Sequence, residues 1–169
     1  MTMDARAIYQ GALVNTHAME QQGLQQMEKQ IGRLERYPDY RALLERHVAT
    51  TKGQLTRLEA AMQAAGTSPS GFKETVTSIA GHIGAQVHAA FQDETLKNLY
   101  AGYAYQYEQI GAYRSLIAIA EAAGETAHVA GFRQSVQEEE SAAQAVAAII
   151  EPVTRRYVEL TVAGEKADR

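Results

Sequence analysis

The sequence contains no cysteine. Without thiols, the chain cannot form disulfides, zinc–thiolate sites or iron–sulfur clusters, and thiol catalysis is excluded. It also contains no run approaching the ~18 consecutive apolar residues of a membrane-spanning helix, so no membrane partner is expected. Lys and Arg total 16 against 20 Asp and Glu, a net charge of -4, and no basic cluster is visible. We therefore expect no nucleic-acid partner.

The chain begins MTMDARAIYQG, which includes Asp4 and lacks a continuous apolar stretch. No secretory signal is expected from it, and the expected location is the cytoplasm. With 169 residues, 46% of them hydrophobic and 21% charged, the chain can bury a proper core. We predict a single domain over residues 1–169.

Helical periodicity dominates the sequence, and no strand pattern competes with it. Pro38 interrupts the first helical pattern, Pro69 follows a C-cap at Gly66, Asp93 is an N-cap candidate, and Pro152 is expected to kink the last helix. The predicted elements are long helices over about 4–36, 38–65, 93–123 and 125–162, a short helix over about 70–90, and a frayed tail at 164–169. This pattern predicts an all-α, ferritin-like four-helix bundle with a long crossover between the second and third long helices.

The inward stripe of every long helix is broken by polar residues near its middle. These residues are His17 and Glu20 in the first helix, His47, Thr51 and Gln54 in the second, Gln106 and Gln109 in the third, and Glu139 with Glu138 beside it in the last. A buried carboxylate costs several kcal/mol unless it is paired, hydrogen-bonded or metal-bound. Four interruptions at about the same depth predict a common polar centre.

A metal site inside the bundle is one interpretation of this centre. Dinuclear carboxylate sites take one Glu from each of two helices and Glu-x-x-His from each of the others. Here Leu44 precedes His47 where Glu is needed, and Ala142 follows Glu139 where His is needed. The expected set is therefore reduced to Glu20, His47 and Glu139 as candidate ligands of iron or manganese, lined by Gln106, Gln109 and Glu138.

Three stretches carry a family resemblance that spans nearly the whole chain. They are NTHAMEQQGLQQMEKQIGRLERYPDYRALLERHVATTKGQLTRLEAAM, QIGAYRSLIAIAEAAG and SVQEEESAAQAV. The sequence resembles the YciF-like branch of the ferritin-like superfamily, which implies a bacterial, stress-associated bundle, commonly dimeric and without a proven activity. The resemblance also implies that Gln106 and Gln109 replace Glu, and that the second helix lacks the family's carboxylates after His47. It therefore implies a degenerate metal site.

Two functions stay open at this point. The first is a non-enzymatic, stress-associated homodimer with no catalytic residue and no cofactor, in which Glu20 and Glu139 belong to a hydrogen-bonded network. The second is an iron- or manganese-dependent oxidase or peroxide-handling protein that uses Glu20, His47 and Glu139. The short ligand inventory favours the first.

Overall fold

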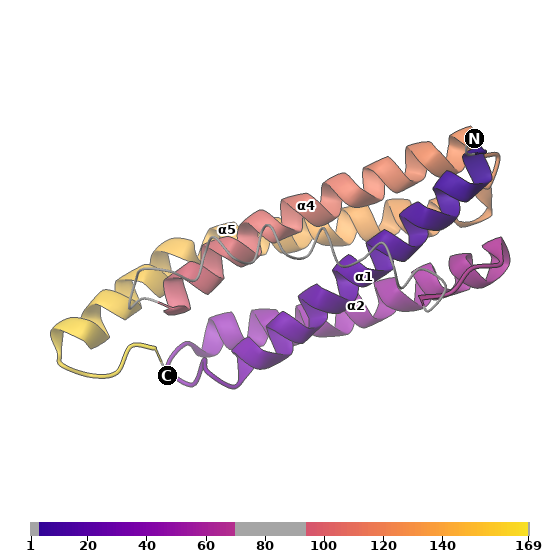
Figure 1. Cartoon of the computed structure of the whole chain (residues 1–169). Coiled ribbons are helices and arrows are strands. Elements are labelled where there is room, and N and C mark those ends of the chain that lie inside the picture. Colours follow the sequence, from indigo (N-terminus) through magenta and orange to yellow (C-terminus); the bar gives the residue numbers. More distant parts are fainter. Residues whose placement is uncertain (1–3, 70–93, 169) are drawn as a thin grey trace.

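The structure, a computed structural model, describes residues 4–69 and 94–168. The described chain is all-α, and the helical bundle predicted from the sequence is confirmed (Figure 1). In chain order the elements are α1 (Ala5–Ile31), α2 (Pro38–Ala65), α4 (Glu94–Ala122), the short 3-10 helix η2 (Thr126–His128) and α5 (Val129–Val162). The predicted short helix over about 70–90 and the predicted cap Asp93 lie outside the described residues.

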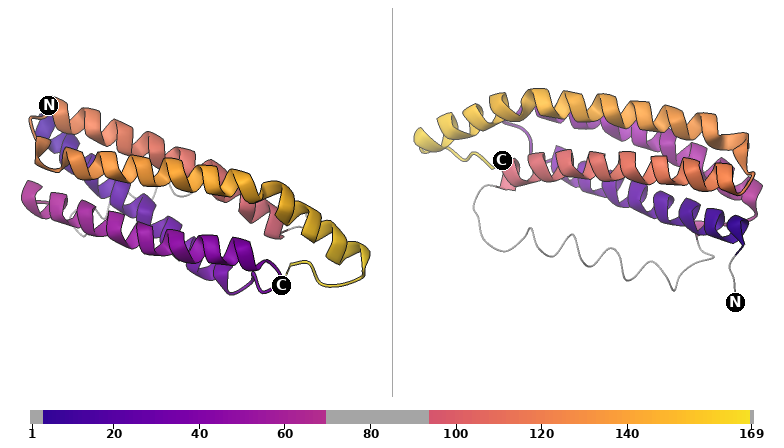
Figure 2. Two further views of the ribbon diagram at one scale, coloured as in Figure 1. Left: turned by 180° about the vertical axis from the view of Figure 1, so that it is seen from behind. Right: turned by 90° about the horizontal axis from the view of Figure 1, so that it is seen from above.

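Two antiparallel helical hairpins, α1–α2 and α4–α5, form the bundle (Figures 1 and 2). Helix α1 lies beside α4, and α2 lies beside α5. Helix α5 is the longest and projects beyond the other three helices at its C-terminal end. None of the described helices is both long and apolar enough to cross a lipid bilayer.

Helix α1 is shorter than predicted. It starts after Asp4, whose carboxylate accepts a hydrogen bond from the Ala7 amide at 2.8 Å, and it ends at Ile31 instead of continuing to about residue 36. Gly32 favours a break here because glycine costs about 1 kcal/mol in a helix interior. The turn that follows brings Leu34 and Tyr37 into the core before Pro38 starts α2.

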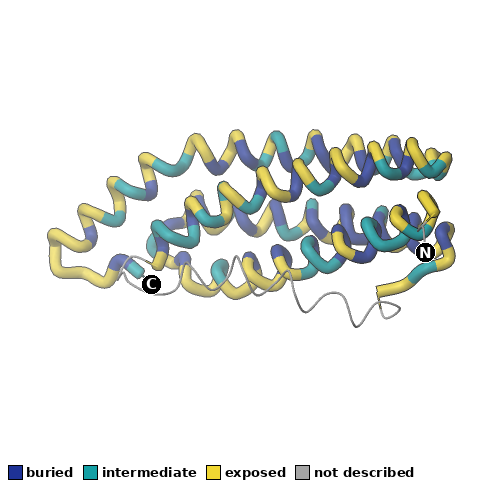
Figure 3. Tube along the Cα trace, turned by 45° about the horizontal axis from the view of Figure 1, so that its top comes forward, coloured by how far each residue is buried: buried dark blue, intermediate teal, exposed yellow. Residues whose placement is uncertain are grey.

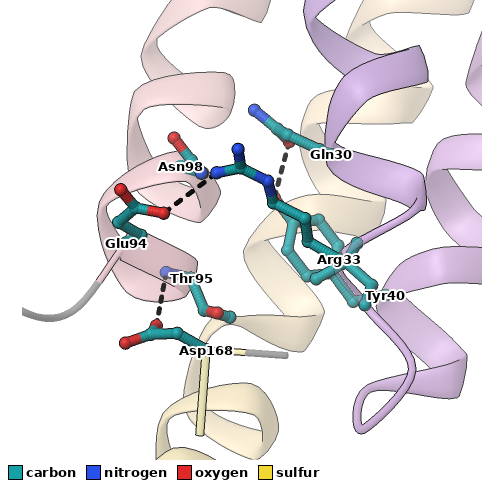
Figure 4. Close-up of a pocket in the computed structure, with 8 residues that line it drawn as sticks. Gln30, Arg33, Tyr40, Glu94, Thr95, Asn98 and Asp168 are labelled. Atoms are coloured by element: carbon teal, nitrogen blue, oxygen red, sulfur yellow. Dashed lines mark hydrogen bonds and ion pairs between the residues drawn. The ribbon is translucent and has the colours of Figure 1, made fainter.

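The C-terminal tail is ordered against the bundle, so the prediction that residues 164–169 fray is wrong for the residues described. Gly164, at φ +72°, reverses the chain after α5. Ala167 is buried and its carbonyl accepts a hydrogen bond from the Tyr37 hydroxyl at 2.7 Å. The Asp168 carboxylate accepts the Thr95 amide at 3.0 Å and so caps the start of α4 (Figure 4).

The tail also borders a small pocket between the helix ends. Its volume is about 10 Å³, room for one water molecule at most. Figure 4 shows Arg33 reaching across it to Glu94, with 3.0 Å between Nη1 and Oε2. This pocket is too small to hold a substrate.

The core consists of two apolar clusters separated by a polar middle. The hairpin-end cluster lies near the α4–α5 turn and is built around Leu13, Leu58 and Phe132, all 0% exposed. The tail-end cluster lies near the C-terminal tail and includes Leu99 and Leu160. Figure 3 shows that the buried positions continue along all four helices between the two clusters.

Candidate functional site: a mid-bundle polar chamber

All four long helices contribute polar side chains to the middle of the core. The sequence predicted these positions from the helical spacing, and each of them is buried. We call this group the polar chamber: Glu20 from α1, His47, Thr51 and Gln54 from α2, Gln106 and Gln109 from α4, and Glu139 from α5. Glu20 and Glu139 are both 0% exposed, so their carboxylates depend entirely on protein partners or bound groups for compensation.

Glu20 is held by a carboxamide from α4. The Gln109 side-chain nitrogen donates to Glu20 Oε2 at 2.8 Å. Burial raises the pKa of Glu20 to about 7, and the nearby charge of Glu139 adds to the shift. Near neutral pH, Glu20 is therefore protonated in a substantial fraction of molecules, unlike an ordinary surface glutamate.

Glu139 has two partners, both from α2. The Gln54 side-chain nitrogen donates to Oε1 at 2.8 Å, and His47 Nε2 lies 3.4 Å from Oε2. Burial acts to lower the pKa of His47, but its interaction with Glu139 and the charge of Glu20 outweigh burial and raise it. The interaction with Glu139 therefore favours the charged imidazolium more than in an ordinary histidine.

Several buried oxygen atoms at this level have no hydrogen-bond partner in the structure. They are Oε1 of Glu20, Gln54 and Gln106, Oε2 of Glu139, Oγ1 of Thr51 and the Tyr113 hydroxyl. Most of these atoms can only accept hydrogen bonds, or accept them when their carboxylate is ionised. The Thr51 and Tyr113 hydroxyls can also donate, and a proton on Glu20 adds one more donor to the chamber.

Two of the polar residues noted in the sequence point away from the chamber. Glu138, predicted to line the chamber, instead contacts the Arg57 guanidinium and accepts from Gln134 at 2.8 Å, so that prediction is wrong. His17 is buried but turns toward the edge of the bundle, where its Nε2 lies 3.2 Å from Glu59. Neither side chain adds a ligand to the centre.

The predicted ligands do not converge as a metal-binding set. Across residues 4–69 and 94–168, no group of three or more His, Asp or Glu side chains is placed to hold one metal ion. One oxygen of Glu20 and one of Glu139 already accept amide hydrogens, whereas carboxylates that bridge two metals use both oxygens. Two carboxylates also cannot balance two divalent ions in a dry core. A dinuclear centre does not fit these residues.

The sequence analysis missed a polar connection beside the chamber. The Arg57 guanidinium donates to Ser135 Oγ at 3.2 and 3.1 Å, and Ser135 is fully buried. Ser135 and Glu20 both lie close enough to the Tyr113 hydroxyl to affect its pKa, although that hydroxyl forms no hydrogen bond of ordinary geometry. Tyr113 is on the same inward stripe of α4 as Gln106 and Gln109, and this spacing was the available signal. The connection links Glu20 to the half-buried Arg57.

Comparison with known proteins gives a family and a structural relative. Residues 4–159 match a family described as a domain of unknown function, DUF892. A crystal structure of a protein from Xanthomonas campestris pv. campestris str. ATCC 33913 is similar, with a TM-score of 0.77 and 22% sequence identity. The similarity covers 92% of this chain and 96% of that one. At this identity the likeness concerns the fold.

Proposed function

Because the chain belongs to the DUF892 family, whose function is unknown, we propose its function from the polar chamber: a non-enzymatic, ferritin-like bundle protein without a metal pair. Hydrogen bonds and a shared proton compensate the buried carboxylates. The resemblance to stress-associated bacterial bundles supports a role in a stress response, exerted through dimerisation or binding of a protein partner.

The observation that carries this proposal is the pairing of each buried carboxylate with a carboxamide. Gln109 donates to Glu20 and Gln54 donates to Glu139, both at 2.8 Å. Charged acceptors strengthen such hydrogen bonds, and replacing them by a metal would leave the amides without acceptors. Metal binding through both oxygens of either carboxylate, as in a bridged metal pair, would therefore break bonds that already stabilise the chamber.

Charge balance supports the same conclusion. Glu139 has His47 at 3.4 Å, and the raised pKa of His47 favours its charged form. Glu20, with a pKa of about 7, can be neutral. When His47 is charged and Glu20 is protonated, the chamber has no net charge for a cation to compensate.

Metal analysis of protein purified from iron- and manganese-supplemented cells tests the proposal. We expect far less than one metal ion per chain. The proposal fails if metal is near-stoichiometric and is lost in Glu20→Ala or Glu139→Ala but kept in Glu138→Ala, the matched control at the surface.

A gain-of-function test uses the two carboxamides of α4. Gln106→Glu with Gln109→Glu changes no heavy-atom count but adds two carboxylates to the chamber. We expect this double variant to bind Fe(II) or Mn(II), measured by titration calorimetry in anaerobic buffer. The control, Gln137→Glu with Gln144→Glu, places the same charges on exposed positions of α5 and should bind none.

The second candidate is a protein that binds one iron or manganese ion through Glu20, His47 and Glu139 and uses it in oxidase or peroxide chemistry. The oxygens without partners on Glu20, Glu139 and Gln106 favour it. Tight, stoichiometric Mn(II) binding by the unaltered chain would select this candidate. The homodimer is a separate prediction, and a monomeric mass by light scattering at micromolar concentration would contradict it.

A further inference from the structure

Helix α4 differs from the other long helices in how its apolar residues are distributed. It is the most apolar of the four and the least amphipathic. Between residues 95 and 113 it contains only two charged residues, Lys97 and Glu108. A bundle helix with one buried face carries charge on the opposite face, whereas a helix that is apolar on several sides packs on several sides. The composition of α4 therefore indicates a second contact surface.

The outer surface of α4 has the residue spacing of a helix–helix contact. We define the outer stripe as Tyr100, Ala104, Tyr107 and Gly111, which follow one another at intervals of four, three and four residues. All four are exposed, and Tyr100 and Tyr107 expose 50% and 56% of their surface. An added Cβ at Gly111 would meet no described atom within 4 Å. Large rings thus alternate with small residues, over which an approaching helix can place its own large side chains.

The apolar surface continues onto α5 at the tail end of the bundle. Four of the five large hydrophobic side chains that are exposed in the described chain lie here: Tyr100 and Tyr107 on α4, and Val158 and Val162 on α5. Nearer the hairpin end, the Arg114–Glu140 and Arg133–Glu121 ion pairs join α4 to α5 in one antiparallel register. This register places Val158 beside the turn of α4 that precedes Tyr100. An exposed apolar patch shared by two helices is typical of a protein contact surface.

We propose that the outer stripe binds a second copy of this chain, with the two α4 helices antiparallel about a twofold axis near Gly102. The proposal rests on the homodimer of the proposed function and names its interface. Lys97 and Glu108 are eleven residues apart, about three turns, so they lie on the same side of α4. In the antiparallel pair, Lys97 of each copy faces the partner subunit's Glu108, and unlike charges meet at both ends of the contact. Lys97 also interacts within its own chain, so these charges set the orientation of the pair and add little to its affinity.

Between the two charge pairs, the same arrangement matches large side chains to small ones. Tyr100 of each copy lies against the partner subunit's Ala104, because the twofold axis relates the two positions. Tyr107 covers the methylene stem of the partner subunit's Lys97. A parallel pair would instead set Tyr100 against Tyr100 and Glu108 against Glu108. Each copy supplies both halves of the contact, which is the pattern expected for a second copy and not for an unrelated partner.

A matched pair of substitutions tests the location of the interface. Ala104→Glu and Ala148→Glu make the same change at exposed positions of α4 and α5. By light scattering at micromolar concentration we expect a dimer for the unaltered chain and for Ala148→Glu, and a monomer for Ala104→Glu, which places two carboxylates beside the axis. Circular dichroism checks that both variants keep their helix content. A dimeric Ala104→Glu would refute this interface and leave the homodimer standing, whereas a monomeric unaltered chain would refute both. Neither result bears on whether the chamber holds a metal.

A charge exchange tests the antiparallel orientation. Glu108→Lys sets Lys97 against a lysine of the partner subunit, and we expect the dimer to weaken by about tenfold because the symmetry changes two charge pairs at once. Combining it with Lys97→Glu restores unlike charges at both ends and should restore the affinity. Sedimentation equilibrium measures the dissociation constants. A combined variant as weak as Glu108→Lys alone would refute the antiparallel arrangement.

Discussion

The apolar clusters at the two ends of the bundle differ from the polar chamber between them in how burial of their side chains affects the stability of the fold. At the ends, side chains such as Leu58 and Phe132 leave water completely and require no partner. In the chamber, Glu20 and Glu139 also leave water completely, yet each needs donors, and several acceptors at that level have none. The two apolar clusters therefore stabilise the fold, and burial of the polar groups in the chamber lowers its stability.

Truncating an end cluster should give the largest effect. Phe132→Ala removes a fully buried ring from the hairpin-end cluster, and we expect a loss of about 3–5 kcal/mol in the free energy of unfolding. Urea denaturation followed by circular dichroism measures it. Gln134→Ala, an exposed position on the same helix, should change stability by less than about 0.5 kcal/mol. Comparable losses for both would mean that this cluster does not stabilise the fold.

The second largest effect should be a pH dependence of the free energy of unfolding, caused by titratable groups in the chamber. The folded pKa of Glu20, about 7, lies above its ordinary value of 4.5, so the folded state retains a proton that the unfolded state releases. Its contribution is full below pH 4.5 and is lost as pH rises through 7, by roughly 3 kcal/mol in total. The raised pKa of His47 acts in the same direction above pH 6.5.

Unfolding curves between pH 5 and 8 measure this slope. Glu20→Gln should flatten it, whereas Glu138→Gln should leave it unchanged. If the slope persists in Glu20→Gln, the proton is held elsewhere.

Removing one donor from the chamber should cost less than truncating the apolar end. Gln109→Leu leaves the Glu20 carboxyl without its amide, and we expect a loss of about 1–3 kcal/mol. Adding Glu20→Leu should recover most of the loss, because an apolar pair needs no partners. A double-mutant cycle by thermal denaturation measures the coupling. Equal stability of the single and double variants would show that the amide does not support the carboxyl group.

The smallest loss of stability is expected next to the tail-end cluster, where the Asp168 carboxylate accepts a hydrogen bond from the Thr95 amide. Asp168→Ala removes the cap of the Thr95 amide and should cost about 1 kcal/mol. Hydrogen exchange at the first turn of α4 measures the change locally. Lys166→Ala, an exposed neighbour, is the control, and an effect as large as that of Asp168→Ala would contradict a specific cap.

The fold and the membership of the chamber could be predicted from the sequence because both follow from helical periodicity. A polar residue on an apolar stripe at mid-helix has to enter the core, and Glu20, Gln54, Gln109 and Glu139 all do so. The partner of each carboxylate could not be predicted. Gln109 pairs with Glu20 across 89 residues, and helix rotation and relative height decide such contacts.

The errors share the same origin. Glu138 lies next to an inward residue, but the 100° step per residue turns it to Arg57 on a neighbouring helix. The tail follows Gly164, which ends α5, and it has no apolar stripe of its own, so it reads as frayed until Tyr37 and Thr95, distant in sequence, supply its partners. Local patterns predict which face a residue takes, and they say little about bonds between distant segments.

The docked tail has a consequence for the order of folding. Its hydrogen bonds join residues separated by 130 and 73 positions: the Tyr37–Ala167 bond requires both hairpins to be assembled, and the Thr95–Asp168 bond requires α4 and α5 to be paired. Contacts with such long loops form late, because loop closure has to precede them. We therefore expect the tail to dock last. A probe that senses the burial of Ala167 should report the last step of folding, after the helical signal has reached its native value.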